Sequence, residues 1–373
     1  MNPRKPSVTA QDVARRAGVS RAVVSRALSN NGSISPDARA RVLRAAEELG
    51  YQVNFLAQGL NRQRSHLIGV IVSRISDPFR STLLDALLNE IQRQGFQALV
   101  SEIHSEQDLA QTLRRFAQFR VSGVIVTSGQ PPEALVSEIH SEQDLAQTLR
   151  RFAQFRVSGV IVTSGQPPEA LVNECVQQHI PVVGINRQPT IPGVDYVCSD
   201  NAAGAELAAD QLLRSGCQRF GWLNHHPSTW AGRMRGEAFG RALQTRGVDV
   251  ERHLAILACQ QEGYAGGLQA AALADEALEG IFCANAQLAC GFLDGMRQRG
   301  REAPADFQLI GFDNTPTTAQ YSYQLTTLHQ DVAAIARQAL ARLLERAADP
   351  SQPSRTTWVE VTLIHRRTSP FVI

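Results

Sequence analysis

The chain has 373 residues, which is long enough for two or three domains. Its hydrophobic fraction of 43% supports sizeable cores, and no apolar run approaches the roughly 20 residues that would span a membrane. The opening MNPRKPSVTAQ lacks the apolar segment of a secretory signal, so we expect a cytoplasmic protein. The six cysteines form no CxxC pair and no His/Cys metal spacing. They predict buried or incidental thiols and no metal site.

The net charge of +2 conceals an asymmetry. Residues 1–65 contain 11 Lys and Arg against 4 Asp and Glu, a net charge of +7, whereas the remaining residues carry 26 against 31, a net charge of −5. A basic segment joined to an acidic body is the distribution expected of a DNA-contacting headpiece. A solvated basic surface would give the same counts, so the charge supports this interpretation without deciding it.

Residues 8–28, VTAQDVARRAGVSRAVVSRAL, predict two short helices around a tight turn. Thr9 is placed to cap the first helix, with Asp12 three residues further on as a partner. Gly18 follows the first helix at a position where a positive φ is favourable. Ser20 then caps the second helix. The segment therefore has the pattern of a helix–turn–helix.

The outward face of the second helix carries residues suited to reading DNA. They are Arg21, Ala22, Ser25 and Arg26. A helix–turn–helix presents the start of its second helix to base edges in the major groove, and an arginine there can donate two hydrogen bonds to guanine. An ordinary helical hairpin with a solvated arginine face is the alternative that the pattern leaves open.

A third helix is predicted after the turn region. Ser35 as cap and Pro36 at the first helical position mark its start, and Gly50 marks its end. We expect its buried side to consist of Val42, Leu43, Ala46 and Leu49. The three helices make a small headpiece.

From His66 onward, short β-branched runs alternate with amphipathic helices. The runs are LIGVIV, FQALV, VSGVIV, IPVVGI, FGWL, GIFCAN and FQLIGF. This alternation predicts an α/β body with parallel sheets covered by helices on both faces. The sequence contains neither GxGxxG after a strand nor GxxxxGK[ST], GxSxG or HExxH, so we expect no dinucleotide or other cofactor and no catalytic residues.

The ordered motifs resemble the lac-repressor (LacI/GalR) family of bacterial transcription regulators. The likeness joins VTxxDVAxxAGVS to VSRxL, then GYxxNxxAxxL, and then the strand LIGVIV. It implies an all-α helix–turn–helix headpiece, a hinge, and a periplasmic-binding-protein-like body of two doubly wound parallel-sheet subdomains with a small molecule between them. The expected boundaries are 1–52 for the headpiece, 53–65 for the hinge, 66–196 with 325–356 for the N-terminal subdomain, and 197–324 with 357–373 for the C-terminal subdomain.

The resemblance also implies that Asn54 to Leu60 form a hinge helix that folds when a dimer occupies its operator. Leu60 would be an apolar wedge in the minor groove, a known way of kinking DNA. The family usually has proline where Val53 stands, and Gly59 costs a helix roughly 1 kcal/mol relative to alanine. Both departures favour a hinge that is disordered off DNA. Without the resemblance, Leu60 reads as an ordinary buried leucine.

Family landmarks in the body imply residues that hold a small, sugar-like polar effector. By resemblance, Asp77 and Phe79 would line the near side of the cleft, and Tyr264 would offer a stacking face. Polyols need such a mixture, because each hydroxyl both donates and accepts hydrogen bonds while the ring faces are apolar. Asp77 before Pro78 is also consistent with the start of a turn.

Three further polar residues would complete the effector site. Arg233 would reach the ligand from the far subdomain, Asn285 would bond a polar group, and Asp313 would accept hydroxyl hydrogens. Each has a structural alternative, namely a surface ion pair, a strand-end cap and a satisfied turn, respectively. Asn186 and Ala286 stand where the family often carries aspartate, which leaves the ligand chemistry open.

One feature lies outside the family pattern. Residues 98–136 recur unchanged as 134–172, offset by 36 positions. Solenoid repeats drift and occur three or more times, so two identical copies indicate a recent duplication or an error in assembling the sequence. Each copy predicts one helix and one strand, and two strands cannot occupy one slot. We expect one copy in the core and the other as an excursion or an added unit beside it, with an apolar face that is an aggregation hazard.

These features predict a ligand-responsive transcription regulator, a repressor, that binds a pseudo-palindromic operator in double-stranded DNA as a homodimer. Backbone and small polar groups near Thr9 and Ser20 would fix the headpiece to phosphates. It would be cytoplasmic, and associated with the nucleoid when bound to its operator. No leucine heptads follow the strand WVEVTLIHRR, which favours a dimer over a tail-bundled tetramer. The alternatives are a solute-binding protein with no DNA role, an enzyme working in the cleft, and a duplicated variant that folds poorly.

Overall fold

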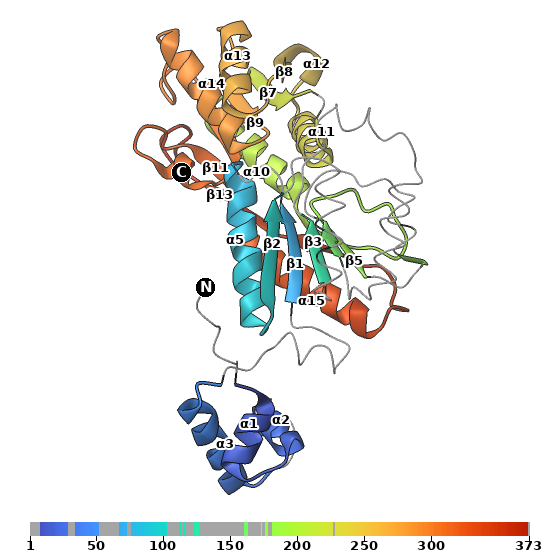
Figure 1. Cartoon of the computed structure of the whole chain (residues 1–373). Helices are drawn as coiled ribbons and strands as arrows, with labels where there is room; N and C mark the ends of the chain where they lie inside the picture. The colour runs from blue at the N-terminus through green and yellow to red at the C-terminus, as the bar shows by residue number, and fades with distance from the viewer. Residues whose placement is uncertain are drawn as a thin grey trace. The chain divides into compact units, whose positions relative to one another are not determined.

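A computed structural model of the chain contains two compact units, the headpiece Met1–Ser65 and the body His66–Ile373 (Figure 1). The structure describes residues 8–28, 34–51, 67–72, 76–102, 112, 115, 123–126, 160–162, 173, 176–177, 181–226 and 228–371. The predicted hinge residues Asn54 and Leu60 lie outside these residues.

The headpiece helices begin and end where their sequence signals lie. They are α1 (Ala10–Ala17), α2 (Arg21–Leu28) and α3 (Pro36–Glu48). At the start of α1, the Thr9 hydroxyl oxygen accepts a hydrogen bond from the Asp12 N–H at 3.3 Å, and the Asp12 carboxylate accepts one from the Thr9 N–H at 3.0 Å. Gly18 follows α1 with a φ of +65°, in the left-handed region that glycine tolerates best. The predicted capping box and helix end are confirmed.

Valine and alanine side chains form the core of the headpiece. The buried residues are Val13, Ala14, Ala17, Val24, Ala27, Val42, Ala45 and Ala46. The expectation that Leu43 is buried was wrong, because its side chain is 49% exposed. The inward stripe of α3 runs through Val42, Ala45, Ala46 and Leu49, which is the i, i+3, i+4, i+7 spacing of one helix face.

The body contains two sheets, as the alternating pattern predicts (Figure 1). In spatial order the first sheet is β12 (Thr356–Val359), β6 (Asp195–Ser199), β5 (Val182–Ile185), β4 (Val160–Val162), β3 (Gly123–Val126), β1 (Leu67–Val72) and β2 (Gln97–Glu102). The second is β13 (Val361–Ile364), β11 (Thr326–Gln330), β10 (Gln308–Asp313), β9 (Gly280–Cys283), β7 (Phe220–His225) and β8 (Leu254–Cys259). Among the described strands, only the pair β11 and β13 is antiparallel.

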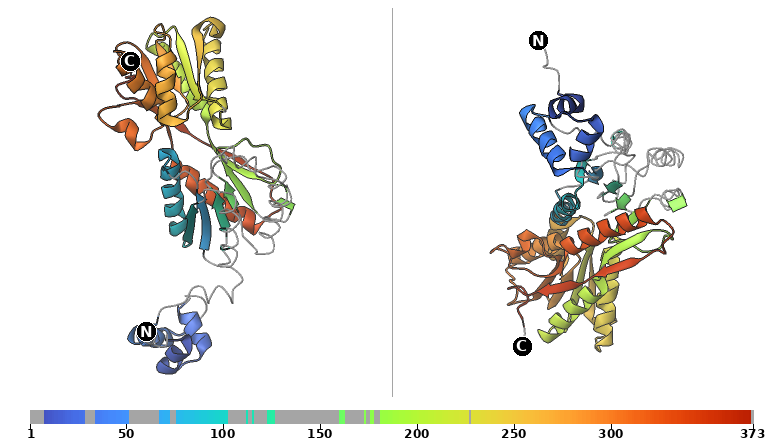
Figure 2. Two further views of the ribbon diagram at one scale, coloured as in Figure 1. Left: turned by 45° about the horizontal axis from the view of Figure 1, so that its top comes forward. Right: turned by 90° about the horizontal axis from the view of Figure 1, so that it is seen from below.

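Helices cover the sheets in packed pairs (Figure 2). On the first sheet α5 (Pro78–Arg93) packs against α15 (Val332–Ala348). Around the second sheet lie α10 (Asn201–Arg214) with α11 (Trp230–Thr245), α13 (Gly263–Leu273) with α14 (Ala286–Gln298), and the short α12 (Val250–His253) and η1 (Pro316–Ala319). In the described part of the chain, no helix is long and apolar enough to cross a membrane.

Each sheet has its own core. In the second, the buried Phe282 ring lies 5.1 Å from the ring of Trp222, 5.2 Å from that of Phe239 and 6.4 Å from that of Phe312. In the first, isoleucine and valine side chains fill the space between the sheet and the pair α5 and α15. Strands that are buried on both faces read as continuous apolar runs, which is why the runs were visible in the sequence.

Within the described residues, the chain crosses between the two sheets after Ser199, Gln330 and Val359. The predicted subdomain boundaries therefore need correction. The boundary after residue 196 divides β6. The segment 325–356 places β11 in the first subdomain, although β11 pairs with β10 of the second sheet. β12 belongs to the first sheet as far as Val359. These short runs have the same appearance in either sheet, and only their remote pairing partners distinguish them.

Both copies of the repeated strand lie in the first sheet, side by side. β3 belongs to the first copy and β4 to the second, and Ile125 lies opposite its own duplicate Ile161. β4 in turn pairs with β5. The second strand is thus an added unit within the sheet, and the excursion alternative does not apply to it. Most other residues of the two copies lie outside the described part of the chain.

The duplicated strands make a matched pair of stability measurements possible. Ile125 and Ile161 are both fully buried in the same core, so Ile125→Ala and Ile161→Ala should each lower the free energy of unfolding by about 2–5 kcal/mol. Urea unfolding measures both. Ile256→Ala, at a side chain that is 66% exposed on β8, should change it by less than about 0.5 kcal/mol. An unchanged midpoint for either buried variant would remove that copy from the core.

Candidate functional site

Helix α2 presents the residues predicted to read DNA. Arg21, Ala22, Ser25 and Arg26 are all exposed. The Val23 N–H donates to the Ser20 hydroxyl oxygen at 3.4 Å, which confirms the predicted cap. The Arg26 Nε donates to the Ala22 carbonyl at 3.3 Å, so this guanidinium lies along the helix surface.

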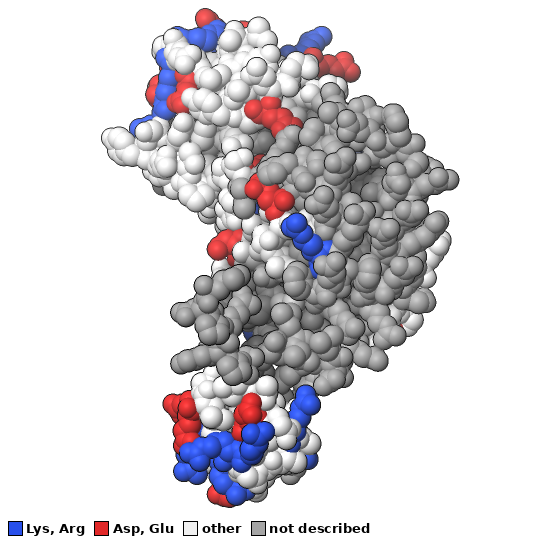
Figure 3. All heavy atoms as spheres, viewed as in Figure 1, with Lys and Arg blue, Asp and Glu red and all other residues white. Residues whose placement is uncertain are grey.

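Basic side chains gather on the headpiece (Figure 3). On α1, the side chain of Arg15 is 76% exposed and that of Arg16 is 59% exposed. Such a surface attracts the phosphate backbone independently of sequence. Thr9 is less available, because both its N–H and its hydroxyl donate to the Asp12 carboxylate, at 3.0 and 2.6 Å. A phosphate contact by Thr9 would require this cap to open.

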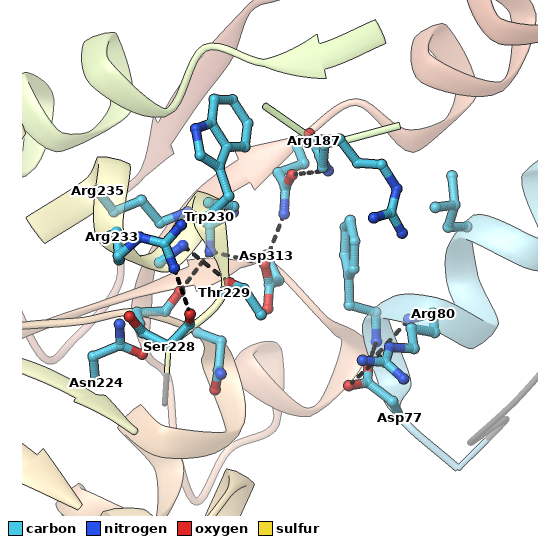
Figure 4. A pocket seen from close by; sticks show the side chains of 18 of the residues that line it. Asp77, Arg80, Arg187, Asn224, Ser228, Thr229, Trp230, Arg233, Arg235 and Asp313 are labelled. Atoms are coloured by element: carbon cyan, nitrogen blue, oxygen red, sulfur yellow. Dashed lines mark hydrogen bonds and ion pairs between the residues drawn. The ribbon is translucent and has the colours of Figure 1, made fainter. Parts of the chain in front are cut away.

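The body holds a pocket of about 310 Å³, within the usual range for small ligands (Figure 4). Residues from both sheets line it, at strand ends and at the first turns of helices. Five of the six predicted effector residues are among them: Asp77, Phe79, Arg233, Asn285 and Asp313.

Tyr264 is the exception, and its predicted role in the pocket is wrong. The side chain is 41% exposed, and its hydroxyl donates to the Asp294 carboxylate on α14 at 2.8 Å. Tyr264 does not line the pocket, because the start of α13 turns it toward α14. Trp230, in the first turn of α11, contributes an aromatic side chain to the lining instead (Figure 4).

Two of the predicted residues are also helix caps. Asp77 Oδ1 accepts hydrogen bonds from the N–H groups of Phe79 and Arg80 at 3.0 and 3.1 Å, and so caps α5. Asn285 Oδ1 accepts one from the Leu288 N–H at 2.9 Å and caps α14. The structural alternatives given for both residues are confirmed, and each still lines the pocket. A ligand would therefore meet the second oxygen of Asp77 and the amide nitrogen of Asn285.

Arg235 and Asp313 are two buried residues in the lining of the pocket. Arg235 Nη1 lies 3.8 Å from Asp313 Oδ1, and the two side chains are only 7% and 9% exposed. Arg235 also donates to Asn201 Oδ1 at 2.7 Å and to the Ala284 carbonyl at 2.6 Å. Its guanidinium carbon lies 3.4 Å from the centre of the Phe312 ring. These partners fix the guanidinium in one position.

Burial sets the protonation of this pair. It raises the pKa of Asp313 to about 6, although the positive charge of Arg235 acts in the opposite direction. Burial also lowers the pKa of Arg235 to about 10. At neutral pH the pocket therefore contains a buried carboxylate beside a guanidinium, a combination that can accept hydrogen bonds from a ligand hydroxyl and donate others to it.

Gln330 connects Asp313 to the first sheet. Its Nε2 donates to Asp313 Oδ1 at 2.7 Å, and its Oε1 accepts from the Ser199 hydroxyl at 2.6 Å and from Asn186 Nδ2 at 3.2 Å. Asn186 Oδ1 in turn accepts from the Ser199 N–H at 2.8 Å. Because Ser199 and Gln330 each precede a sheet crossing, one hydrogen-bond network joins the pocket to two of the connections.

Sequence reasoning missed several lining residues. Arg235 lies two positions after Arg233, and the spacing RMR could have raised it as a candidate. Arg233 itself is exposed and donates to the Ser228 carbonyl at 2.9 Å. It has no ion-pair partner among the described residues. Trp230 and Gln330 gave no local signal.

The described cysteines are buried, as the sequence predicts. Burial raises the pKa of Cys217 and of Cys290 to about 12, which keeps both thiols protonated and unreactive. In the described part of the chain, no cluster of three or more His, Cys, Asp or Glu could hold a metal ion.

Asp313 should make the stability of the fold depend on pH. Its pKa of about 6 in the folded protein exceeds the ordinary value of 3.8, so the folded chain binds this proton more tightly than the unfolded chain does. The stabilisation is complete below about pH 4 and is lost as the pH rises through about 6. The stability advantage of wild type over Asp313→Asn should therefore shrink by roughly 2 kcal/mol between pH 4.5 and pH 7. Urea unfolding at the two pH values measures this, and an equal advantage at both would contradict it.

Two family models match the chain. The model for bacterial regulatory proteins of the lacI family matches residues 9–54, and that for a periplasmic binding protein-like domain matches residues 209–369. The HTH-type transcriptional regulator GalS of Salmonella typhimurium is 30% identical over 363 residues, with 96% of each chain covered. The ribose operon repressor of Bacillus subtilis is 27% identical, with 97% of this chain and 98% of that protein covered.

Solved structures share the fold. The lac repressor dimer bound to operator and the anti-inducer ONPF has a TM-score of 0.74 at 22% identity, covering 98% of this chain and all of that one. A LacI family regulator from Enterococcus faecium with bound ribose has a TM-score of 0.62 at 24% identity, covering 82% and 98%. With both domain types matched and a curated relative similar over nearly its full length, the chain belongs to the LacI family of bacterial regulatory proteins.

Proposed function

We propose that this regulator is a repressor that binds a pseudo-palindromic operator as a homodimer and responds to a small polar effector in the pocket of the body. The observation that carries the proposal is that one chain has both an exposed face on α2 and a pocket lined by Asp313. Gln330 bonds the Asp313 carboxylate and the Ser199 hydroxyl, and Gln330 and Ser199 each precede a crossing between the sheets. The lac repressor solved as a dimer on operator supports the dimeric state. We place the protein in the cytoplasm, where its DNA target lies.

At the DNA end, Arg21, Ala22 and Arg26 would enter the major groove, with Ser25 beside them. Their exposure on a short, rigidly packed helix suits base reading. Ser20 and the start of α1 at Thr9 would meet phosphates. The minor-groove contacts proposed for the hinge rest on the sequence motif alone.

At the effector end, Asp313, Arg235 and Asn285 would bond hydroxyl groups while Trp230 and Phe79 cover apolar ring faces. This division of polar and aromatic side chains suits a carbohydrate-like molecule. Similar proteins solved with ribose and with cellobiose support an effector of that class.

Coupling between the two ends would pass through the sheet crossings. An effector changes the balance between two subdomain arrangements only if it binds one of them better. Gln330 bonds Asp313, Ser199 and Asn186 together, so a ligand that competes for Asp313 acts on the residues that precede two crossings. The basic headpiece argues against a solute-binding protein with no DNA role. The curated relatives are regulators, which argues against an enzyme.

Two substitutions on α2 test base reading. Arg21→Ala and Arg26→Ala should each weaken binding to a duplex selected from a randomised pool by about 1–3 kcal/mol, because a bidentate arginine–guanine contact supplies discrimination of that size. Fluorescence anisotropy at fixed salt measures the affinity of the full chain for the selected duplex and for a scrambled one.

The matched control is Arg44→Ala on α3, where an arginine that is also exposed is removed from another helix. It should lower the affinities for both duplexes by a similar small factor, since only a phosphate attraction is lost. If Arg21→Ala and Arg26→Ala behave in the same way as this control, α2 does not read bases.

A further inference from the structure

The two walls of the pocket differ in charge. On the second-sheet side, the charged lining residues that the structure describes are Arg233 and Arg235 with Asp313 and Glu262, so the two signs balance. Asp313 lies 3.8 Å from Arg235, and Glu262 lies 3.9 Å from the His225 ring. On the first-sheet side, the described charged lining residues are Arg80, Arg187 and Asp77. Among these residues, the first-sheet side therefore has the excess of positive charge.

The ion pair between the Asp77 carboxylate and Arg80 is long. Asp77 Oδ1 is occupied by the two N–H groups that it caps, and Oδ2 lies 3.8 Å from Arg80 Nε. Arg80 is partly buried, with its side chain 22% exposed, and its Nη1 is a buried donor with no hydrogen-bond partner among the residues that the structure describes. Buried donors are normally paired, so within that part of the chain this nitrogen lacks an acceptor.

Arg187 approaches the same region from the end of β5 (Figure 4). Burial lowers its pKa to about 10, and the positive charge of Arg80 acts in the same direction. Both residues line the same pocket. Gly184 makes room for this arrangement, since a Cβ there would lie 2.9 Å from the Tyr196 ring and 3.4 Å from the Arg187 Cδ. Two like charges are thus held beside one cavity.

We infer that the effector is an anionic carbohydrate, a sugar acid or a sugar phosphate, whose carboxylate or phosphate group binds between Arg80 and Arg187 while its hydroxyl groups meet Asp313 and Asn285. An anion there would accept hydrogen bonds from Arg80 Nη1 and relieve the repulsion between the two cations. The inference rests on the proposed function, because it assumes that the effector occupies this pocket.

The test compares neutral sugars with their charged derivatives, using the full chain. Calorimetric titration at constant ionic strength measures the Kd of D-glucose against D-glucuronate and D-glucose 6-phosphate, and of D-ribose against D-ribose 5-phosphate. At least one anion should bind about tenfold or more tightly than its parent, the scale of a hydrogen bond to a charged group. The carboxylate and phosphate arms show which source of charge is preferred.

Variants test whether Arg80 causes the preference for the anion over its neutral parent. Arg80→Gln should reduce it to less than about threefold, and Arg80→Lys, which keeps the charge, should retain part of it. Arg252→Gln is the matched control, because that arginine is 81% exposed on α12 and does not line the pocket, and it should leave the preference unchanged. A folded Arg80→Gln protein, verified by its melting temperature, with an undiminished preference would overturn the inference.

The remaining outcomes separate the inference from the proposed function. Neutral parents that bind as tightly as their anions overturn the anionic effector and leave a carbohydrate-responsive regulator standing. Failure of every sugar to bind, with binding to the selected duplex intact, overturns the inference together with the carbohydrate class of the proposed effector.

Discussion

The buried amide of Gln330 is the constraint on which the body of this regulator depends. It links the carboxylate of Asp313, in the pocket, to Ser199 at the end of β6 and to Asn186 just after β5, both in the first-sheet subdomain. Polar groups that are buried away from water must keep their hydrogen-bond partners, because losing a partner there costs far more free energy than it would in water. Under the proposed function, a ligand hydroxyl that competes for Asp313 would therefore disturb its bond to Gln330, next to two of the connections between the sheets.

Two residues of this hydrogen-bond network, Asn186 and Asp313, have a strained backbone conformation. Asn186 and Asp313 are non-glycine residues with φ values of +52° and +86°, a conformation that persists only where surrounding contacts hold it. Asn186 is held by Ser199 and Gln330, and Asp313 by Gln330 and Arg235. Both residues line the pocket, so the network that joins the two sheets also forms part of the pocket wall.

The repeated strand bears on the pocket through the first sheet. A parallel sheet accepts a second copy of an apolar strand readily, because Ile125 and its duplicate Ile161 are both fully buried and the two strands pair in parallel. By lying between β3 and β5, β4 adds one strand spacing, about 4.8 Å, between the end of β1, which leads to Asp77, and the end of β5, which leads to Asn186 and Arg187. The repeat thus sets the width of the wall that carries the positive charge.

The sequence by itself determined the features that arise within a few residues: the cap at Thr9, the helix end at Gly18, the exposed arginines of α2 and the α/β alternation of the body. Through a family resemblance, it also singled out five residues that line one pocket. Only the tertiary structure decided that β11 belongs to the second sheet, that Tyr264 turns to Asp294, and that Arg235 and Gln330 line the pocket. These outcomes depend on partners distant in sequence, as with Ser199 and Gln330, which are 131 residues apart, and periodicities of two or 3.6 residues carry no information at that range.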